Sequence, residues 1–162
     1  MEIISIKNCP NSLINEFSCG NEKLDIYFKK YAKQNDLNNL GKTFVLIDEH
    51  IIIGYYTLSN AQIEFEENNQ LIKKLPKYPI PCIRIARLAI NEDMQHEGYG
   101  SYLLKNIFQR IMKIINDTAV YFIIVDAKES SKEFYEHYGF IRLKDDSYTY
   151  IMNVKTIIKA LS

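Results

Sequence analysis

"CIRIARLAINEDMQHEGYGSYLL", residues 82–104, joins three kinds of sequence in one short stretch. Residues 82–90 are largely apolar and predict a strand, and an amphipathic helix is predicted after Gly100 because apolar residues recur there at helical spacing. Those residues are Leu104, Ile107, Phe108, Ile111 and Ile115. The polar loop between them brings backbone N–H groups to a helix N-terminus, where the macrodipole favours an anion. A side chain at Gly98 or Gly100 would keep a phosphate from the backbone, so the stretch predicts a phosphate-binding loop.

The spacing of this loop excludes two nucleotide-binding motifs. A P-loop requires a lysine after its second glycine, and here Ser101 follows Gly100. The dinucleotide fingerprint requires a third glycine three residues later, where this chain has Leu103. Within residues 95–101 the one acidic side chain is Glu97, so the loop itself has no acidic pair to hold Mg²⁺, and the phosphate is expected to be a handle and not the reacting group. The glycines alone also fit an ordinary strand-to-helix turn, and the function therefore depends on the rest of the chain.

The segments on either side predict a mixed α/β fold. Residues 119–127 are continuously apolar, as in a strand covered on both faces, and a short helix is expected within 130–139. Further elements are predicted from apolar spacing and turn residues: a strand at 2–5, a helix capped by Asn21, a hairpin over 43–59, a connection from about 64 to 81 and a hairpin over 140–154. This order fits one domain over residues 1–162, with a largely antiparallel sheet and a central parallel strand pair.

Composition sets limits on the class of protein. The 162 residues include 20 basic and 20 acidic side chains, and the formal net charge of zero argues against wholesale wrapping of nucleic acid while allowing a local basic patch. We find neither a signal peptide nor an apolar run of membrane-spanning length, so we expect a cytoplasmic protein without membrane contact. The three cysteines, Cys9, Cys19 and Cys82, form no CxxC pair and have no neighbouring histidine at ligand spacing. We therefore expect reduced, buried thiols and no metal site.

Two motifs point to a known family. The strand "RLAI", then Gln95-x-x-Gly98-x-Gly100 and a helix, resembles motif A of the GNAT N-acetyltransferase superfamily. "FYEHYGF" (134–140) resembles the F-Y-x-x-x-G-F that these enzymes carry after the next strand, and "GYYTL" (54–58) is similar to their central hairpin strand. The resemblance implies the GNAT fold: a twisted, mostly antiparallel sheet with a splayed central parallel pair and flanking helices.

A closer resemblance is to the GNAT toxins that acetylate aminoacyl-tRNA. Those proteins begin with F-x-C-G-x-x-x-L-D ahead of a helix, and "FSCGNEKLD" (17–25) stands in that place. They also carry a proline-rich lead into a strand that ends G-R-L-A-V. The corresponding "PIPCIRIARLAI" (79–90) has Ala86 in place of the glycine.

The resemblance implies acetyl-CoA as the co-substrate. Its pantetheine arm would lie where the strands 82–90 and 119–127 splay apart. It would pair with backbone groups of Leu88, Ala89 and Ile90. Phe134, in the downstream motif, is also expected to contact the cofactor. The pyrophosphate would be held by amides of the loop residues Gln95, His96, Glu97, Gly98, Tyr99, Gly100 and Ser101. Because the backbone does this work, the side chains of His96 and Glu97 are expected to be exposed.

The resemblance also implies a mechanism in which a neutral amine attacks the thioester directly. Tyr135 matches the family's tyrosine that protonates the leaving thiolate, and a phenol with a pKa near 10 is a reasonable donor to a thiolate whose conjugate acid lies near 8 to 9. The general base stays open among Glu64, Glu66, Glu92 and water. His50, in a hairpin turn, and His137, on another face of the helix than Tyr135, are expected at the surface.

The acceptor amine also stays open. Substrate phosphates would be met by Arg87, which matches an arginine of the toxin branch, and by cations without such a counterpart: Arg84, Lys29, Lys30 and Lys33, with Lys73, Lys74 and Lys77 as a second cluster. Each lysine cluster also fits an ordinary solvated face. The zero net charge counts against tRNA, so a small-molecule or protein amine is the enzymatic alternative, and a non-catalytic module that binds acyl-CoA or a partner is the third.

The toxin branch implies two further partners. A toxin of this kind would be blocked by a small ribbon-helix-helix antitoxin. Such toxins often form homodimers, and the strand "YTYIMNV" (148–154) with the tail "KTIIKAL" (155–161) is the apolar edge that we expect to pair.

Overall fold

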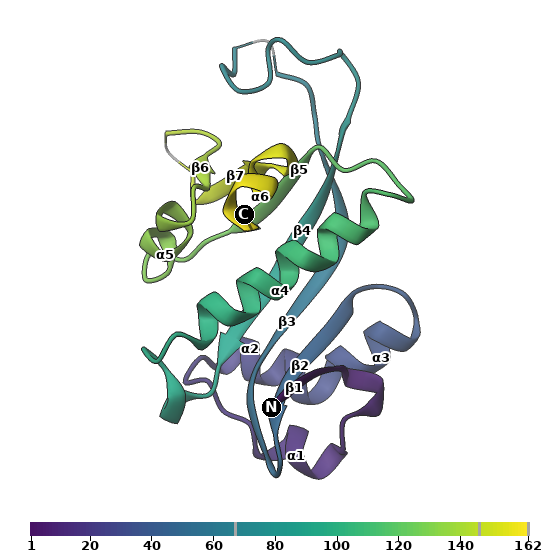
Figure 1. Ribbon diagram of the computed structural model, residues 1–162, viewed down its shortest axis with the longest axis vertical. Coiled ribbons are helices and arrows are strands. Elements are labelled where there is room, and N and C mark those ends of the chain that lie inside the picture. The colour runs from purple at the N-terminus through teal and green to yellow at the C-terminus, as the bar shows by residue number, and fades with distance from the viewer. Residues whose placement is uncertain (67, 146, 162) are drawn as a thin grey trace. The chain divides into compact units, whose positions relative to one another are not determined.

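The computed structural model describes residues 1–66, 68–145 and 147–161 (Figure 1). The strands are β1 (Glu2–Ser5), β2 (Lys42–Asp48), β3 (Ile51–Ile63), β4 (Ile80–Ile90), β5 (Phe122–Asp126), β6 (Ile141–Arg142) and β7 (Thr149–Asn153). The helices are α1 (Asn11–Glu16), α2 (Glu22–Ile26), α3 (Ala32–Leu37), α4 (Tyr99–Ile114), α5 (Lys132–His137) and α6 (Val154–Leu161). Shorter helical segments are η1 (Ile6–Asn8), η2 (Tyr27–Tyr31) and η3 (Glu92–Met94).

The strands form one seven-stranded sheet in the order β1-β2-β3-β4-β5-β7-β6. The β1–β2, β2–β3, β5–β7 and β6–β7 pairs are antiparallel, and the β4–β5 pair is parallel. The expected fold, a mostly antiparallel sheet with one parallel pair and flanking helices, is therefore confirmed.

The chain divides into two compact units, each of which is described by itself. Unit 1 comprises Met1–Ser59 and Ala86–Ile107, and unit 2 comprises Asn60–Ile85 and the chain from Phe108 onward. The elements β3, β4 and α4 contribute residues to both units. That residues 1–162 act as a single domain stays a prediction.

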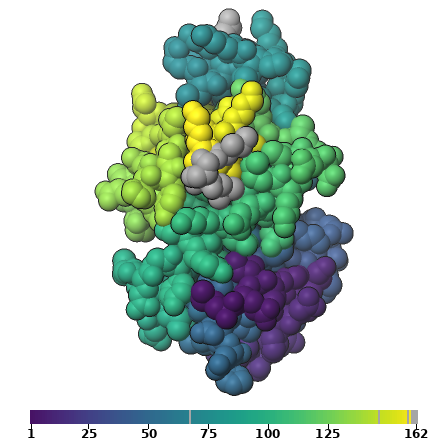
Figure 2. Space-filling view, viewed as in Figure 1, coloured from purple at the N-terminus to yellow at the C-terminus, as the bar shows by residue number. Residues whose placement is uncertain are grey.

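In unit 1, an aromatic core forms between the N-terminal helices and the hairpin β2–β3. The rings of Phe28 and Tyr55 stack with centroids 4.3 Å apart, and Phe17 meets both rings edge-on. The Tyr55 hydroxyl donates to the carbonyl of Leu24 at 2.7 Å, so this buried phenol is satisfied. Asn21 caps α2 by accepting from the amide of Leu24 at 3.1 Å, as the sequence predicts. The N-terminal residues, in purple, lie at the surface of this unit in Figure 2.

In unit 2, the core forms around β5. Cys82–Ile85 of β4 pair with Phe122–Val125 of β5, and β7 pairs along the other edge of β5. The four residues Phe122–Val125 are buried, which explains why this strand is apolar without alternation. Ile72, from the connection between β3 and β4, is fully buried and closes this core.

The sequence patterns locate most elements, with four differences. β4 begins at Ile80, inside the expected connection, and β5 begins at Phe122 instead of residue 119. The helix α1 has no counterpart among the predictions. The prediction that residues 148–161 form an apolar sheet edge is wrong, because the chain forms the helix α6 after Asn153 and β7 lies between β5 and β6. Part of the turn predicted at 145–147 lies outside the described residues.

No helix among the described residues has the length and apolar character needed to cross a bilayer.

Candidate active site

The loop that follows β4 is fixed at its start by Asn91. This buried residue donates from its backbone to the carbonyl of Ile53 at 2.8 Å and from its side chain to the carbonyl of Ile52 at 3.2 Å. The pairing of β2 with β3 shifts register at this level, opposite Leu46 and Ile47, so the two carbonyls belong to an irregular part of β3. Asn91 therefore provides hydrogen-bond donors to both carbonyls and fixes the position of the chain after β4.

The remainder of the loop has an unusual backbone. His96 has φ of 66° and Gly98 has φ of 90°, both in the left-handed region, and α4 begins directly afterwards at Tyr99. A Cβ built on Gly98 would meet nothing within 4 Å, so open space lies beside this backbone. The first N–H groups of an α-helix have no acceptor inside the helix. This geometry is compatible with a bound phosphate, and phosphate binding stays a prediction. The side chains of Gln95, His96 and Glu97 are exposed.

The strand β4 continues beyond its parallel pairing with β5. That pairing ends at Ile85 and Val125, five residues before β4 itself ends at Ile90. The backbone of Leu88, Ala89 and Ile90 therefore lies outside it. These backbone groups have no partner in β5, and an extended ligand can pair with such groups; that the pantetheine arm binds them stays a prediction.

Tyr135 lies in unit 2, on α5, and its side chain is enclosed by other aromatic rings. Phe134 and Phe140 contact it edge-on, with centroids 5.1 and 5.4 Å away, and only 5% of the residue is exposed. Burial raises the pKa of its phenol above the ordinary value of 10.0. Within the described part of the chain the hydroxyl has no hydrogen-bond partner. Tyr135 is therefore a protonated phenol whose O–H donates to no described residue.

Arg87 is the predicted cation that keeps its donors available. Its guanidinium carbon lies 3.3 Å from the centroid of the Tyr27 ring, and Asn35 donates to the hydroxyl of the same tyrosine at 3.4 Å. No described residue accepts a hydrogen bond from Arg87 or forms an ion pair with it. A half-buried guanidinium that lies over an aromatic ring and keeps its N–H donors available suits a phosphate or carboxylate.

The other predicted cations differ in their surroundings. Arg84 forms a salt bridge with Asp126, whose second oxygen accepts from Thr149 at 2.8 Å, so the positive charge of Arg84 is largely neutralised. The half-buried Lys33 donates from its ammonium to the carbonyl of Cys9 at 3.0 Å and to Asn11 at 2.8 Å, so it already has two acceptors. The side chains of Lys29 and Lys30 are exposed.

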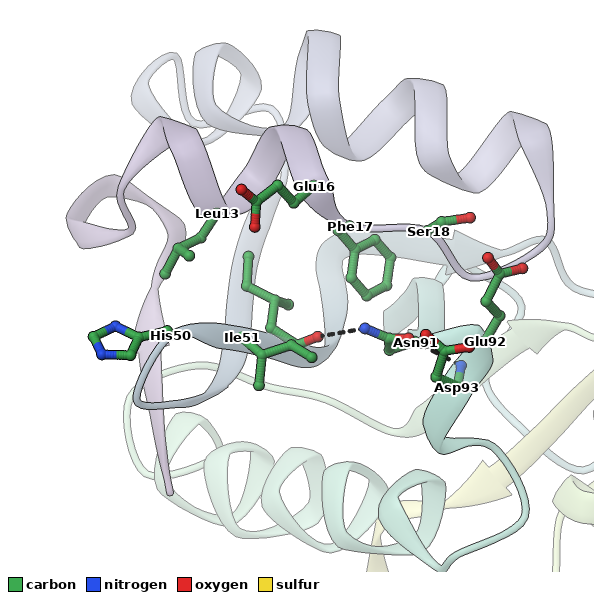
Figure 3. A pocket seen from close by; sticks show the side chains of 10 residues that line it. Leu13, Glu16, Phe17, Ser18, His50, Ile51, Asn91, Glu92 and Asp93 are labelled. Atoms are coloured by element: carbon green, nitrogen blue, oxygen red, sulfur yellow. Dashed lines mark hydrogen bonds between the residues drawn. The ribbon is translucent and has the colours of Figure 1, made fainter.

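A small cavity of unit 1 has no signal in the sequence. It measures about 170 Å³ and is lined by residues from α1, the β2–β3 turn and the start of the loop after β4 (Figure 3). Three of the lining residues are acidic, Glu16, Glu92 and Asp93, and His50 stands at the hairpin turn. Sequence reasoning missed it because three separate segments of the chain build it.

The candidates for the general base also lie in different settings. Glu92 lines this cavity, whereas Glu66 pairs with Lys144 at 2.8 Å and Glu64 accepts from Gln62 at 3.0 Å. The side chains of His50 and His137 are exposed. In the ranges 1–66, 68–145 and 147–161, no three His, Cys, Asp or Glu side chains stand together as a metal site would require.

Known proteins resemble this chain along most of its length. The family described as "Acetyltransferase (GNAT) domain" matches residues 39–142. The tRNA-acetylating toxin of Mycobacterium tuberculosis (strain ATCC 25618 / H37Rv) is 27% identical over 128 residues, which cover 78% of this chain and 77% of that protein. A probable toxin TacT of Sinorhizobium fredii (strain NBRC 101917 / NGR234) is 26% identical over 137 residues, 76% of this chain and 75% of its own.

Solved structures of proteins with similar names also resemble this chain in fold. A tyrosine-to-phenylalanine mutant of KacT has a TM-score of 0.85 at 26% identity, and the alignment covers 98% of this chain and 97% of that one. AtaT complexed with acetyl-methionyl-tRNAfMet has a TM-score of 0.86 at 23% identity, with 99% of each chain covered, and so shares the fold. The family match covers most of the chain, includes the phosphate loop and the segment with Tyr135, and extends through β2 to β6: the chain belongs to the GNAT acetyltransferase family.

Proposed function

We propose that this protein transfers the acetyl group of acetyl-CoA to the amino group of an aminoacyl-tRNA and acts as a toxin. The observation that carries the substrate is the likeness to the tRNA-acetylating toxin of Mycobacterium tuberculosis, which covers more than three quarters of both chains. KacT and AtaT, which resemble this chain over nearly its whole length, add support. A protein acting on aminoacyl-tRNA would work in the cytoplasm.

The roles of the residues follow from their settings. Backbone groups of Leu88, Ala89 and Ile90 bind the pantetheine arm, and the amides of residues 95–101 bind the pyrophosphate at the start of α4. The amine nitrogen attacks the thioester carbonyl, the carbon–sulfur bond breaks, and the Tyr135 hydroxyl gives its proton to the departing thiolate. The nitrogen loses one proton to the general base as the amide forms, and Tyr135 regains a proton from solvent before the next turnover. The phenol is protonated at neutral pH, as an acid catalyst requires, and burial raises its pKa further above 10.0.

Three cations in unit 1 suit the phosphates of a tRNA. Arg87 has its donors free of the described residues, and Lys29 and Lys30 are exposed on η2, the segment that also carries Tyr27. Arg84 and Lys33 are the weaker candidates, because Asp126 and the carbonyl of Cys9 already engage them. A local patch of this kind can bind phosphates on a chain whose charges balance overall.

A small-molecule or protein amine is the second candidate acceptor. One observation favours it: 20 basic and 20 acidic residues give a formal net charge of zero, whereas tRNA-binding proteins are generally basic. The donor, the loop and Tyr135 would act in the same way on such an amine.

An antitoxin is the partner that the proposed function requires. AtaT has been seen bound to the C-terminus of its antitoxin AtaR, and KacTA with DNA. We expect a small DNA-binding protein encoded beside this one to bind the chain and suppress its activity. Pairing into a homodimer stays a prediction.

The test uses acetyl-CoA labelled in its acetyl group. The purified protein is incubated with aminoacyl-tRNAs charged one at a time, with the same tRNAs uncharged, with polyamines and with peptides. Label on charged tRNA that is absent from uncharged tRNA supports the proposal, and the Tyr135→Phe variant provides the control for contaminating activity. Label on polyamines or peptides alone would establish the second candidate. Label on none of them would reduce the protein to a non-catalytic module.

A further inference from the structure

The segment 17–25 forms a compact turn that its own side chains hold together. Asp25 accepts from the backbone amide of Cys19 at 2.9 Å with one carboxylate oxygen and from the Ser18 hydroxyl at 3.3 Å with the other. Gly20, with φ of 85°, allows the chain to reverse between them. The side chains of Phe17 and Cys19 are buried in the core of unit 1, and their packing fixes the turn to that core.

Two carbonyl groups of this turn bind the loop that follows β4. The carbonyl of Cys19 accepts from the side-chain amide of Gln95 at 2.8 Å, and the carbonyl of Ser18 accepts from the backbone amide of Glu92 at 2.9 Å. The Gln95 amide also donates to the carbonyl of Ile90, at 3.1 Å, and so ties the loop to the end of β4. Ser18 and Glu92 stand next to each other in Figure 3.

These contacts stand next to the strained part of the loop. His96, directly after Gln95, has φ of 66°, a backbone conformation that residues other than glycine adopt only at a cost in free energy. Such a conformation persists where its surroundings hold it. The contacts of Asn91 hold the start of the loop, and the Gln95 side chain is the last described tie before His96 and Gly98.

The two partners also come from different parts of the sequence. The loop lies within residues 39–142, which match the acetyltransferase family, whereas residues 17–25 lie outside that match. A segment outside the matched residues therefore contacts the loop on which the acetyl donor is expected to bind.

We propose that residues 17–25 are a brace that sets the conformation of the pyrophosphate-binding loop, with Gln95 and Asp25 as its positioning residues. Gln95 acts through its side chain on the loop itself, and Asp25 acts through Ser18 and Cys19, whose carbonyls it orients. The inference rests on the proposed function, because it takes the loop as the site of the pyrophosphate of acetyl-CoA.

The brace predicts a selective defect. Gln95→Ala removes both side-chain hydrogen bonds, so a smaller fraction of loops is ready to bind, and the Kd and KM for acetyl-CoA rise about tenfold with kcat unchanged. Asp25→Ala produces the same defect. Asp25→Asn restores affinity, since its side-chain oxygen still accepts from Cys19 and its amide can donate to the Ser18 hydroxyl.

The experiment compares two acetyl donors. S-acetylpantetheine lacks the pyrophosphate, so its KM should be equal in the wild-type chain and in Gln95→Ala, while the KM for acetyl-CoA differs. Lys23→Ala, on the exposed side of the same segment, is the matched control and should bind both donors as the wild type does. Thermal unfolding of each variant identifies any loss of fold, and Gln95→Ala, at an exposed position, carries the test if Asp25→Ala unfolds.

The outcomes separate the two proposals. A wild-type chain that does not bind acetyl-CoA overturns the proposed function and the brace with it. A wild-type chain that binds acetyl-CoA while Gln95→Ala binds it equally well overturns the brace alone. An equal loss with both donors also overturns it, because general damage and not the pyrophosphate loop would then be the cause.

Discussion

At the scale of single residues, the role proposed for Tyr135, general acid to the leaving thiolate, gives the most specific prediction. Its phenol is buried among aromatic rings and has no hydrogen-bond partner among the described residues, so removing the hydroxyl disturbs no described contact. We therefore expect Tyr135→Phe to keep its fold and its affinity for acetyl-CoA while kcat falls by roughly 100-fold or more, the usual contribution of a general acid. Calorimetric titration with acetyl-CoA and steady-state kinetics measure the two quantities. Turnover equal to wild type would remove Tyr135 from the mechanism.

Arg87 and Arg84 form a matched pair on the same strand. Arg87 has no acceptor among the described residues, whereas Arg84 is paired with Asp126. We expect Arg87→Gln to weaken binding of aminoacyl-tRNA about tenfold and to reduce the salt dependence of binding by about one phosphate contact. Arg84→Gln should change binding much less, and neither variant should change the affinity for acetyl-CoA. Filter binding at several salt concentrations measures this, and equal losses in the two variants would contradict the assignment.

At the scale of elements, Gly54 shows how closely β3 approaches its neighbours in unit 1. A Cβ at this position would lie 2.6 Å from the carbonyl oxygen of Ala89 and 2.8 Å from the side chain of Ile90. A backbone carbonyl in a sheet cannot swing aside, so Gly54→Ala should lower the free energy of unfolding by about 2 to 3 kcal/mol. It should also raise the KM for acetyl-CoA, because β4 must move where the donor is expected.

The control for this prediction is Gly41→Ala. The nearest atom to its Cβ would be a methyl group of Thr57 at 3.2 Å, which can adjust, and alanine restricts the unfolded chain. We expect a change below about 1 kcal/mol. Urea unfolding at pH 7 measures both variants, and similar destabilisation in the two would show that the close approach at Gly54 is relieved at little cost.

Elements with a periodic pattern or a cap could be predicted from the sequence. Alternation or continuous apolar runs marked the strands, Asn21 marked the start of α2, and apolar spacing marked α4. α1 could not be predicted, because six residues after Pro10 carry too short a period. The tail was assigned wrongly for a related reason: a short apolar run such as residues 155–161 fits a strand or a helix, and tertiary contacts decide between them.

The position of the loop after β4 could be predicted from its glycines. Gly98 has a positive φ and open space beside its backbone, whereas phosphate binding by the loop stays a prediction. Side-chain partners from distant segments could not be predicted. Nothing near Arg84 in the sequence indicates Asp126, and nothing near Lys33 indicates the carbonyl of Cys9. The Gln95 side chain likewise reaches Cys19, 76 residues away in the chain, which no local pattern could show.

At the scale of the whole molecule, balanced charge and local chemistry give different information. A net charge of zero describes the average field, whereas phosphate binding depends on a few cations that lack acceptors of their own. The ion pairs of Asp126 with Arg84 and of Glu66 with Lys144 neutralise cations in unit 2. Arg87 in unit 1 has no such partner among the described residues. The net charge of the chain therefore does not identify the molecule that accepts the acetyl group, whereas the assay with charged tRNA does.

The buried thiols and phenols predict how the stability of the molecule depends on pH. Burial raises the pKa of Cys19 and of Cys82 from 9.0 to about 11 and raises the pKa of Tyr55 and Tyr135 as well. Below pH 9 these groups are protonated in both the folded and the unfolded chain. Between pH 9 and about 11 the unfolded chain loses protons that the folded chain keeps, so the free energy of unfolding falls, by about 2 kcal/mol for each thiol.

Urea unfolding at pH 7.5, 9 and 10.5, in the presence of a reductant, measures this fall. Cys82→Ala serves as the comparison: it should be less stable than wild type at pH 7.5, because a buried side chain is shortened, yet lose less stability on going to pH 10.5, because one raised pKa is gone. In the folded protein the same thiols should react slowly with iodoacetamide at pH 8, since the thiolate is the reactive form and burial suppresses it. A free energy of unfolding that stays constant up to pH 10.5, or a slope that Cys82→Ala leaves unchanged, would mean that these thiols titrate in the folded chain as they do in the unfolded one.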